Sequence, residues 1–302
     1  MALGLSKLLT STAGALDRRF GWDKLPRPLG VLTLVGLRTR LREKNLYDTG
    51  AGAAKAAPDS GPHRTRKLDG SYTDLEKPAM GMVGARFGRN VPVDGTYPEP
   101  LPQLLEPSPR LVSRELLTRD EFKPATIVNV LAGAWLQFEV HDWFSHGKNV
   151  PEDPFELELA GDDPWPDRPM RIERTRSDPA PDANGGPPTY VTADSHWWDG
   201  SQIYGSEPAL AAALRSKEGG KLRLDPDGQL PRDLEEHVDL TGVAGNFWLG
   251  LALLHTLFTH EHNAICDRLQ QEYPGWSDGE LYDRARLINA ALMAKIHTVE
   301  WT

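Results

Sequence analysis

The segment "LQFEVHDWFSHG", residues 136–147, places polar side chains that could do chemistry among large apolar residues. Each residue of an α-helix advances by about 100°, so Gln137 and His141 share one face. His146 follows His141 by five residues, and the two rings therefore point about 140° apart. A zinc site on this helix alone is disfavoured, because histidines four residues apart are the spacing that shares one metal. Asp142 points to another side than His141, so these neighbours could serve two different sites.

Two interpretations of this helix stay open on the segment alone. Val130, Gly133 and Ala134 lie on or beside the face of Gln137 and His141, so a flat ligand could approach closely and meet an amide and an imidazole. Alternatively, the helix is an ordinary buried element whose glutamine and histidine only satisfy backbone groups, as buried polar side chains normally do.

A second segment, "SHWWDGSQIYG", brings further oxygen atoms at alternating positions, which an extended or curling loop turns to one side: Ser195, Trp197, Asp199 and Ser201. Serine and aspartate offer hard oxygens, whereas Trp197 can offer only its backbone carbonyl. Together with the carboxylate of Asp142, the set provides five or more oxygen donors, which suits Ca²⁺. The "DGS" sequence by itself is an ordinary turn, so the loop alone is a weak signal.

These segments together resemble the animal-type haem peroxidase and cyclooxygenase superfamily, and within it the fatty-acid alpha-dioxygenase branch. The resemblance rests on "AWLQFEVHDWFSH", "HWWDGSQIYGSE" and "LFTHEHNAICDRLQQEYPGWSDGELYDRARLINAALMAKIHTVEWT". The N-terminal "GWDKLPRPLGVLTLVGLRTRLREKNLYDTG" and the final "KIHTVEWT" point to the dioxygenase branch. The similarity spans most of the chain in order and spacing, but it covers only the N-terminal half of the family's domain.

The resemblance implies a role for each matching residue. His141 matches the distal histidine of haem b, and Gln137 matches its distal neighbour. His297 matches the histidine that helps to hold the substrate carboxylate. The calcium ligands implied by the match are Asp142, Ser195, Trp197 through its carbonyl, Asp199 and Ser201. Ser195 stands where the wider superfamily usually has threonine, a departure that keeps the hydroxyl group.

The implied reaction inserts O₂ at the alpha carbon of a long-chain fatty acid and gives a 2-hydroperoxide, with peroxide as activator of the haem. The family's proximal histidine, radical tyrosine and carboxylate-binding arginine follow the segment that matches "KIHTVEWT", and no residue here is assigned to them. His255, His260 and His262 are interpreted as core histidines with structural hydrogen bonds. A hydrogen-peroxide-dependent haem peroxidase and a non-catalytic truncated remnant that needs a complementary chain are the alternatives.

The fold expected is mainly α, a haem-peroxidase-like helical fold with long loops, apparently truncated. Helices are expected from about 124 to 144, from 246 to 271, and from Asp278 toward the end, where Ser277 and Glu280 have capping-box spacing. The expected organisation is N-terminal basic amphipathic helices, a linker and irregular segment, and part of a catalytic domain: 1–48, 49–123 and 124–302. The apolar period continues to the last residues, so we expect exposed apolar faces on the last two helices.

Composition limits the partners. The net charge of −9 argues against a nucleic-acid binder, but residues 1–45 carry nine Lys/Arg and three Asp/Glu. A basic amphipathic helix in this region could contact a membrane surface peripherally, or it could pack on its own domain. The first 16 residues do not resemble a signal peptide. The single cysteine, Cys266, favours a reducing compartment, so a cytoplasmic location is expected.

Overall fold

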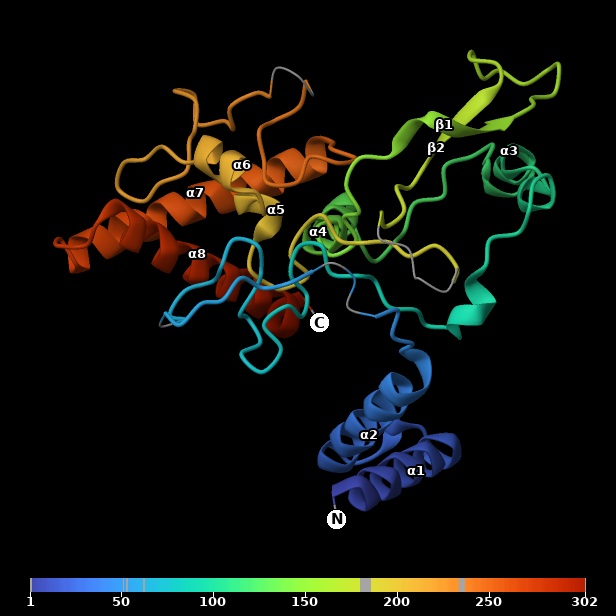
Figure 1. Cartoon of the computed structure of the whole chain (residues 1–302), viewed down its shortest axis with the longest axis horizontal. Coiled ribbons are helices and arrows are strands. Elements are labelled where there is room, and N and C mark those ends of the chain that lie inside the picture. The colour runs from blue at the N-terminus through green and yellow to red at the C-terminus, as the bar shows by residue number, and fades with distance from the viewer. Residues whose placement is uncertain are drawn as a thin grey trace. The chain divides into compact units, whose positions relative to one another are not determined.

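The computed structural model describes residues 2–50, 52, 54–61, 63–179, 186–233 and 237–301, without the side chains of 2–9, 42–45 and 301. The chain is mainly helical and has long loops, as expected (Figure 1). It divides into two compact units. One unit holds residues 1–50, 87–99 and 181–188, and the other holds residues 51–86, 100–180 and 189–302.

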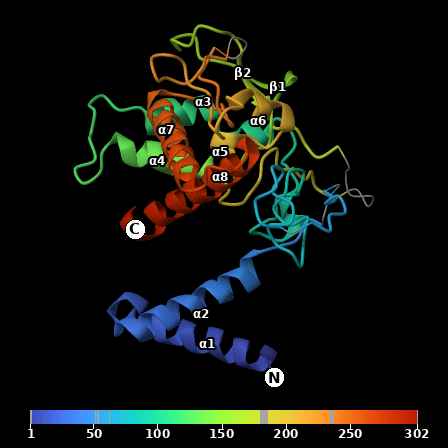
Figure 2. The same ribbon diagram turned by 90° about the vertical axis from the view of Figure 1, so that its left-hand side faces the viewer.

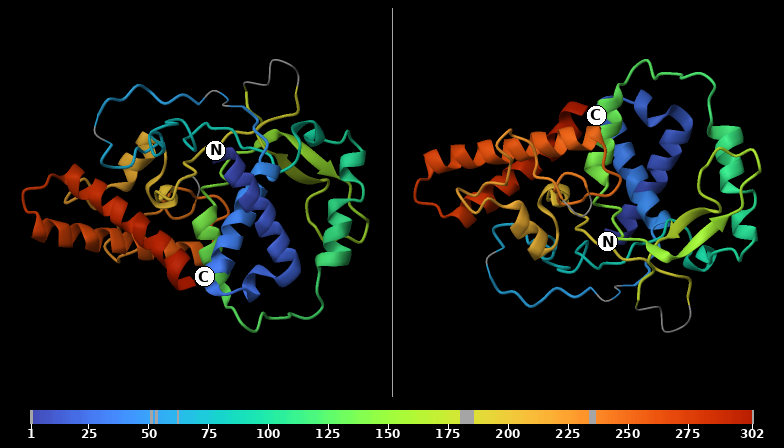
Figure 3. Two further views of the ribbon diagram at one scale, coloured as in Figure 1. Left: turned by 90° about the horizontal axis from the view of Figure 1, so that it is seen from below. Right: turned by 90° about the horizontal axis from the view of Figure 1, so that it is seen from above.

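The first unit is built on a helical hairpin. Its helices are α1 (Ala2–Phe20) and α2 (Arg27–Asn45), joined through a short 3-10 turn, η1 (Trp22–Lys24), and Figure 3 shows the two lying side by side. Beyond α2, Tyr47 and Arg89 exchange backbone hydrogen bonds of 2.8 and 2.9 Å, which attach the segment around the turn η2 (Val93–Thr96) to this unit. The predicted linker 49–123 is therefore divided between the two units, and the domain boundaries proposed from the sequence stay a prediction.

The core of the second unit lies among three helices, α4 (Val130–Val140), α7 (Leu249–Glu272) and α8 (Asp278–Lys295). Figure 2 shows α7 and α8 packed against each other and α4 lying against α7. Short elements complete this unit: η3 (Gln103–Leu105), α3 (Pro109–Val112), η4 (Ser113–Leu117), α5 (Ser201–Tyr204), α6 (Pro208–Leu214) and η5 (Ile296–Trp301). The buried side chains at the centre include Phe138, Tyr204, Leu251 and Phe258.

The first helix of this core is shorter than predicted. It begins at Val130 rather than near Pro124, because the Asn129 side chain caps it by accepting a hydrogen bond of 3.0 Å from the Leu131 N–H. It ends at Val140, and His141 is its C-cap residue, so the predicted end near Phe144 was too late. Gly147 lies beyond the helix end and does not cap it.

Helices α7 and α8 follow the sequence prediction closely. The capping box is confirmed: Ser277 Oγ accepts from the Glu280 N–H at 3.3 Å, and Glu280 Oε2 accepts from the Ser277 N–H at 2.9 Å. Apolar side chains on the outer face of α7 are exposed, with Leu249, Leu253 and Leu257 at 82%, 49% and 55%. These exposures agree with the apolar face predicted for this helix.

The structure also contains a two-stranded antiparallel sheet, which was not among the elements expected from the sequence. Its strands are β1 (Val150–Leu157) and β2 (Met170–Arg174). Both faces are largely exposed, so the apolar alternation that predicts a half-buried strand is absent. Cross-strand contacts stabilise the pair instead: the Arg174 guanidinium lies 3.8 Å from the centre of the Phe155 ring, and Arg171 pairs with Glu156 at 3.1 Å.

Over the described residues, no helix combines the length and apolarity that crossing a bilayer requires.

Replacing Ser277 tests whether its side chain caps α8 and thereby stabilises the protein. Ser277→Ala removes the side-chain acceptor of the Glu280 N–H, and we expect the free energy of unfolding to fall by about 1 kcal/mol in chemical denaturation. Ser60→Ala, at an exposed loop serine, is the matched control and should leave stability within about 0.5 kcal/mol of the parent protein. Equal stabilities of the two variants would contradict the capping assignment.

Candidate functional site

The C-terminal end of α4 presents His141. Its backbone N–H donates to the Gln137 carbonyl at 3.0 Å, which closes the last turn. Neither ring nitrogen of His141 has a hydrogen-bond partner within the described part of the chain, although both are buried. Burial lowers the pKa of His141 to about 4. The ring is therefore neutral near pH 7, and one of its nitrogens can accept a proton.

Gln137 lies one turn before His141 and faces the same part of the molecule. Its Nε2 donates to the Asn246 carbonyl at 3.2 Å, and its Oε1 accepts from Trp248 Nε1 at 2.7 Å. The His141 ring lies 5.5 Å from the His255 ring, which belongs to α7. Both side chains thus lie against the segment 246–255, as one shared helix face requires.

Asp142 is turned to the opposite side and contacts the tryptophan-rich loop. Ser201 Oγ donates to Asp142 Oδ2 at 2.7 Å, and both side chains are almost completely buried. Asp142 Oδ1 accepts from the Trp143 N–H at 2.9 Å. The structure therefore brings the helix end and the loop together across 59 residues of sequence.

The loop curls on itself so that its oxygen atoms gather. Asp199 Oδ1 accepts from the Ser201 N–H at 3.2 Å, and the Asp199 carboxylate also accepts from the Ser195 side chain. Ser201 Oγ lies 3.5 Å from the Ser195 carbonyl, and the Trp197 carbonyl accepts from the Asp199 N–H at 2.8 Å. All five residues implied as calcium ligands are connected through these contacts, with Asp142 joined by Ser201.

The charges at this cluster are not balanced by the protein. Burial raises the pKa of Asp142 well above its ordinary value, and burial also raises that of Asp199 against the opposing effect of Arg286. Arg286, from α8, is buried and lies 3.3 Å from Asp199 Oδ2. Arg286 pairs with Asp199, whereas the charged groups that act on Asp142 are the carboxylates of Asp199 and Asp194, so the cluster keeps an excess of negative charge when its carboxylates are ionised.

No group of three or more His, Cys, Asp or Glu that could hold a metal occurs among the described residues. The cluster at Asp142 contains two carboxylates, and its remaining donors are hydroxyl and carbonyl oxygens. Such a donor set fits a hard cation such as Ca²⁺ and does not fit zinc, which takes nitrogen and sulfur ligands in most sites.

His297 also lies close to α4. It belongs to η5, and its Nδ1 accepts from Trp135 Nε1 at 3.3 Å. Its ring meets the Trp198 ring edge-on, with the centroids 5.3 Å apart. Because the indole N–H can only donate, Nδ1 of His297 is the acceptor in this contact.

An apolar groove adjoins His297. It lies between α4 and α7 and has a volume of about 750 Å³. Its lining includes Trp135, which bonds His297, and Ile296, which precedes His297 in the chain. Other lining residues are Ile127, Leu131, Leu253 and Leu257. The groove thus has an apolar wall, and His297 is connected to it through Trp135 and Ile296.

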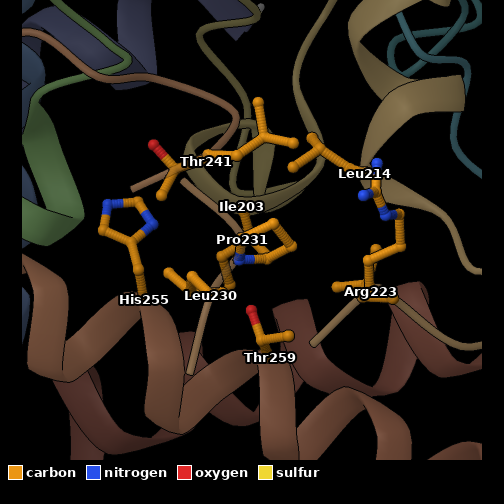
Figure 4. Close-up of a pocket in the computed structure, with 10 residues that line it drawn as sticks. Ile203, Leu214, Arg223, Leu230, Pro231, Thr241, His255 and Thr259 are labelled. Atoms are coloured by element: carbon orange, nitrogen blue, oxygen red, sulfur yellow. The ribbon is translucent and has the colours of Figure 1, made fainter. Parts of the chain in front are cut away.

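The histidines of α7 divide into two kinds. His262 Nε2 donates to the Gly220 carbonyl at 3.0 Å, and its Nδ1 lies 3.0 Å from the Tyr204 hydroxyl. His260 Nε2 donates to the Gly228 carbonyl at 2.8 Å, so both histidines fit the structural interpretation. His255 does not: it is fully buried, and neither of its ring nitrogens has a partner among the described residues. The expectation that His255 is hydrogen-bonded in the core was therefore wrong. It borders a cavity of about 10 Å³, where its ring faces Thr241 (Figure 4).

Sequence reasoning also missed Glu139 and Arg286. Glu139 is 4% exposed, and its Oε1 has no partner within the described chain. Burial raises the pKa of Glu139 to about 7. The helical period alone places Glu139 near Asp142, three residues on, and that spacing was the signal available for it.

Comparisons with known proteins agree on one family. The family model described as animal haem peroxidase matches residues 65–302. Alpha-dioxygenase PIOX of Oryza sativa subsp. japonica is 36% identical over 290 residues, which are 95% of this chain and 46% of that protein. Alpha-dioxygenase 1 of Capsicum annuum is 35% identical over 308 residues, which are 99% of this chain and 46% of that protein.

Solved structures give the same result. The crystal structure of a variant of Oryza sativa fatty acid alpha-dioxygenase with palmitic acid superposes with a TM-score of 0.83 at 33% identity. The match covers 98% of this chain and 48% of that chain. Peroxidase A of Dictyostelium discoideum, at 18% identity and a TM-score of 0.60, shares the fold. The chain spans about half the length of the curated relatives it matches.

The titration of Glu139 gives a pH prediction. In the unfolded chain Glu139 titrates near 4.5, whereas in the folded protein it titrates near 7, so the free energy of unfolding falls as pH rises between these values. A rise of this size corresponds to about 3 kcal/mol. Glu139→Gln lacks this loss, so its stability relative to the parent should rise by that amount from pH 4.5 to 7 in urea titrations.

The control is Glu173→Gln, at an exposed glutamate of β2. It should keep the pH profile of the parent protein. Parallel profiles for Glu139→Gln and the parent would show that Glu139 is not held in its protonated form.

Proposed function

The chain belongs to the animal haem peroxidase family, and we propose that it forms part of a haem-dependent fatty-acid alpha-dioxygenase. The reaction is insertion of O₂ at the alpha carbon of a long-chain fatty acid, which gives a 2-hydroperoxide. The observation that carries this proposal is the identity with alpha-dioxygenases over nearly the whole chain, 36% over 290 residues. The apolar groove beside His297 supports it independently.

Haem b is proposed to lie beside His141 and Gln137. The residues fit the group in one clear respect, since neither buried nitrogen of His141 has a partner among the described residues, and an imidazole is costly to bury without a hydrogen-bond partner or a ligand. When bound, haem supplies the redox chemistry that peroxide activates. His141, with its lowered pKa, can take a proton from a peroxide and return it to the leaving oxygen.

Calcium is proposed at the cluster of Asp142, Ser195, Trp197, Asp199 and Ser201. The excess of buried negative charge around Asp142 and Asp199 supports a bound cation. A divalent ion there would stabilise both the loop and the end of α4. His141 directly precedes Asp142, so the same ion would hold the imidazole in place without touching it.

The fatty acid is proposed to lie in the groove between α4 and α7, with its carboxylate toward His297. The groove's volume is in the range of small-molecule sites. His297 is the residue placed at the carboxylate because an imidazole N–H can donate a hydrogen bond to a carboxylate. Long-chain acyl groups match the leucine- and isoleucine-rich walls.

Two alternatives remain as possible outcomes of experiment. A hydrogen-peroxide-dependent haem peroxidase would need His141 but would make no use of the groove or of His297. A non-catalytic protein that needs a complementary chain would need neither. The cytoplasmic location stays a prediction, which fractionation of cells that express the tagged chain can test.

His297 separates the enzymatic candidates. In a chimera that joins this chain to the remaining half of the rice relative, His297→Ala should lower kcat/KM for palmitic acid at least tenfold, because the carboxylate loses a donor. Peroxide-driven oxidation of a small phenol should change less than twofold. His146→Ala, at a histidine that bonds the Phe144 carbonyl and Thr175, is the control, and the Soret band verifies haem loading of each protein. Equal losses on both substrates would contradict the dioxygenase proposal.

Binding of Ca²⁺ should raise the Tm of the chain. After treatment with EGTA, 1 mM Ca²⁺ should raise the Tm of the chain by several degrees, since an ion that binds only the folded state stabilises it. Asp142→Asn should lose most of this rise, whereas Asp153→Asn, at an exposed carboxylate of β1, should keep it. A Tm that is the same in Ca²⁺ and in EGTA would count against the site.

A further inference from the structure

The α1–α2 hairpin has its small residues inside and its large apolar residues outside. The buried side of each helix is made of small residues at regular spacing: Thr10, Ala13 and Gly14 on α1, and Gly30, Thr33 and Gly36 on α2. A Cβ atom on Gly30 would lie 2.8 Å from the Trp22 carbonyl oxygen, so the start of α2 packs closely on the η1 turn. The contact between the helices thus buries little apolar surface.

Large apolar side chains lie on the outside of the same hairpin. On α2, Val31, Leu32, Leu34 and Val35 are 43–60% exposed. Leu41, one to two turns later, is 58% exposed. Water normally drives such residues to the helix–helix contact, so this arrangement is the reverse of a soluble helical hairpin. The outward face therefore needs an apolar partner.

The turn between the helices has the composition of a lipid interface. Phe20 and Trp22 are 50% and 42% exposed, and the Arg19 guanidinium lies 5.4 Å from the Phe20 ring centre. Within residues 18–27 the sequence carries four cations, Arg18, Arg19, Lys24 and Arg27, and one acid, Asp23. Aromatic rings beside lysine and arginine are typical of peripheral helices at the headgroup level.

We propose that the α1–α2 hairpin docks on an anionic phospholipid bilayer, with the Phe20–Trp22 turn and the outward face of α2 at the headgroup boundary. The +6 charge of residues 1–45 complements anionic lipid, whereas the whole chain is at −9. Protein-docking faces are depleted of lysine, and two copies of this hairpin would repel each other. The hairpin rests on the surface, in agreement with the absence of a described helix able to span the bilayer. The docking is independent of haem and of the proposed reaction.

Sedimentation of the full chain with lipid vesicles tests the proposal. The chain should bind vesicles of phosphatidylcholine with one quarter phosphatidylserine, and bind vesicles of phosphatidylcholine alone at least tenfold more weakly. Arg18→Gln with Arg19→Gln should weaken binding about fivefold per cation removed. Val31→Glu with Val35→Glu places two carboxylates on the outward face and should reduce binding at least tenfold.

Matched controls keep the result interpretable. Leu116→Glu with Leu117→Glu changes two leucines that are equally exposed on η4, and it should bind as the parent does. Brominated lipids should quench part of the tryptophan fluorescence, and Trp22→Phe should remove that part while sedimentation persists. Far-UV circular dichroism verifies helicity, which substitutions at exposed helix positions should preserve.

Each opposing outcome overturns the proposal. Absence of binding to anionic vesicles would do so, as would equal losses in the Val31/Val35 and Leu116/Leu117 variants. A dimer in analytical ultracentrifugation that Val31→Glu with Val35→Glu dissociates would assign the face to a second copy. Amide exchange of α2 that vesicles leave unchanged would assign it to packing within the chain.

Discussion

The hydrogen bond between Ser201 and Asp142 is the contact on which the candidate site depends. It joins the end of α4 to the loop at 195–201, and it is completely buried. Because Asp142 directly follows His141, the bond fixes the position of the imidazole from the opposite side of the helix. One side of the helix end is therefore available for a ligand while the other side is held by the loop, and neither task interferes with the other.

The same contact buries carboxylates whose negative charge needs a compensating cation. Asp142 and Asp199 are held out of water, and the buried Arg286 pairs with Asp199. A second cation would remove the remaining charge, so the fold of the loop and the affinity for a divalent ion are linked. Arg286 also ties α8 to the loop through a hydrogen bond of 3.1 Å from its Nε to the Asp199 carbonyl, so α8 as well as α4 is joined to this cluster.

Sequence alone predicts those parts of the site that depend on local periodicity. Helix geometry separates His141 from Asp142, and the spacing of Ser277 and Glu280 predicts where α8 begins. It could not predict that Arg286 faces Asp199, because the two residues are 87 positions apart and no local pattern joins them. The sequence also could not predict β1 and β2, because a ribbon exposed on both faces has no apolar period. It could not predict that the ring nitrogens of His255 have no hydrogen-bond partner among the described residues, because that results from the packing of several segments.

A double-mutant cycle on Asp142 and Ser201 tests the central contact most directly. The free energy of unfolding is measured for Asp142→Ala, Ser201→Ala, the double variant and the parent protein. A buried hydrogen bond to a carboxylate that organises the site should give a coupling energy of at least about 1 kcal/mol. Additive effects, within about 0.3 kcal/mol, would show that the helix end and the loop are held independently and would contradict the account.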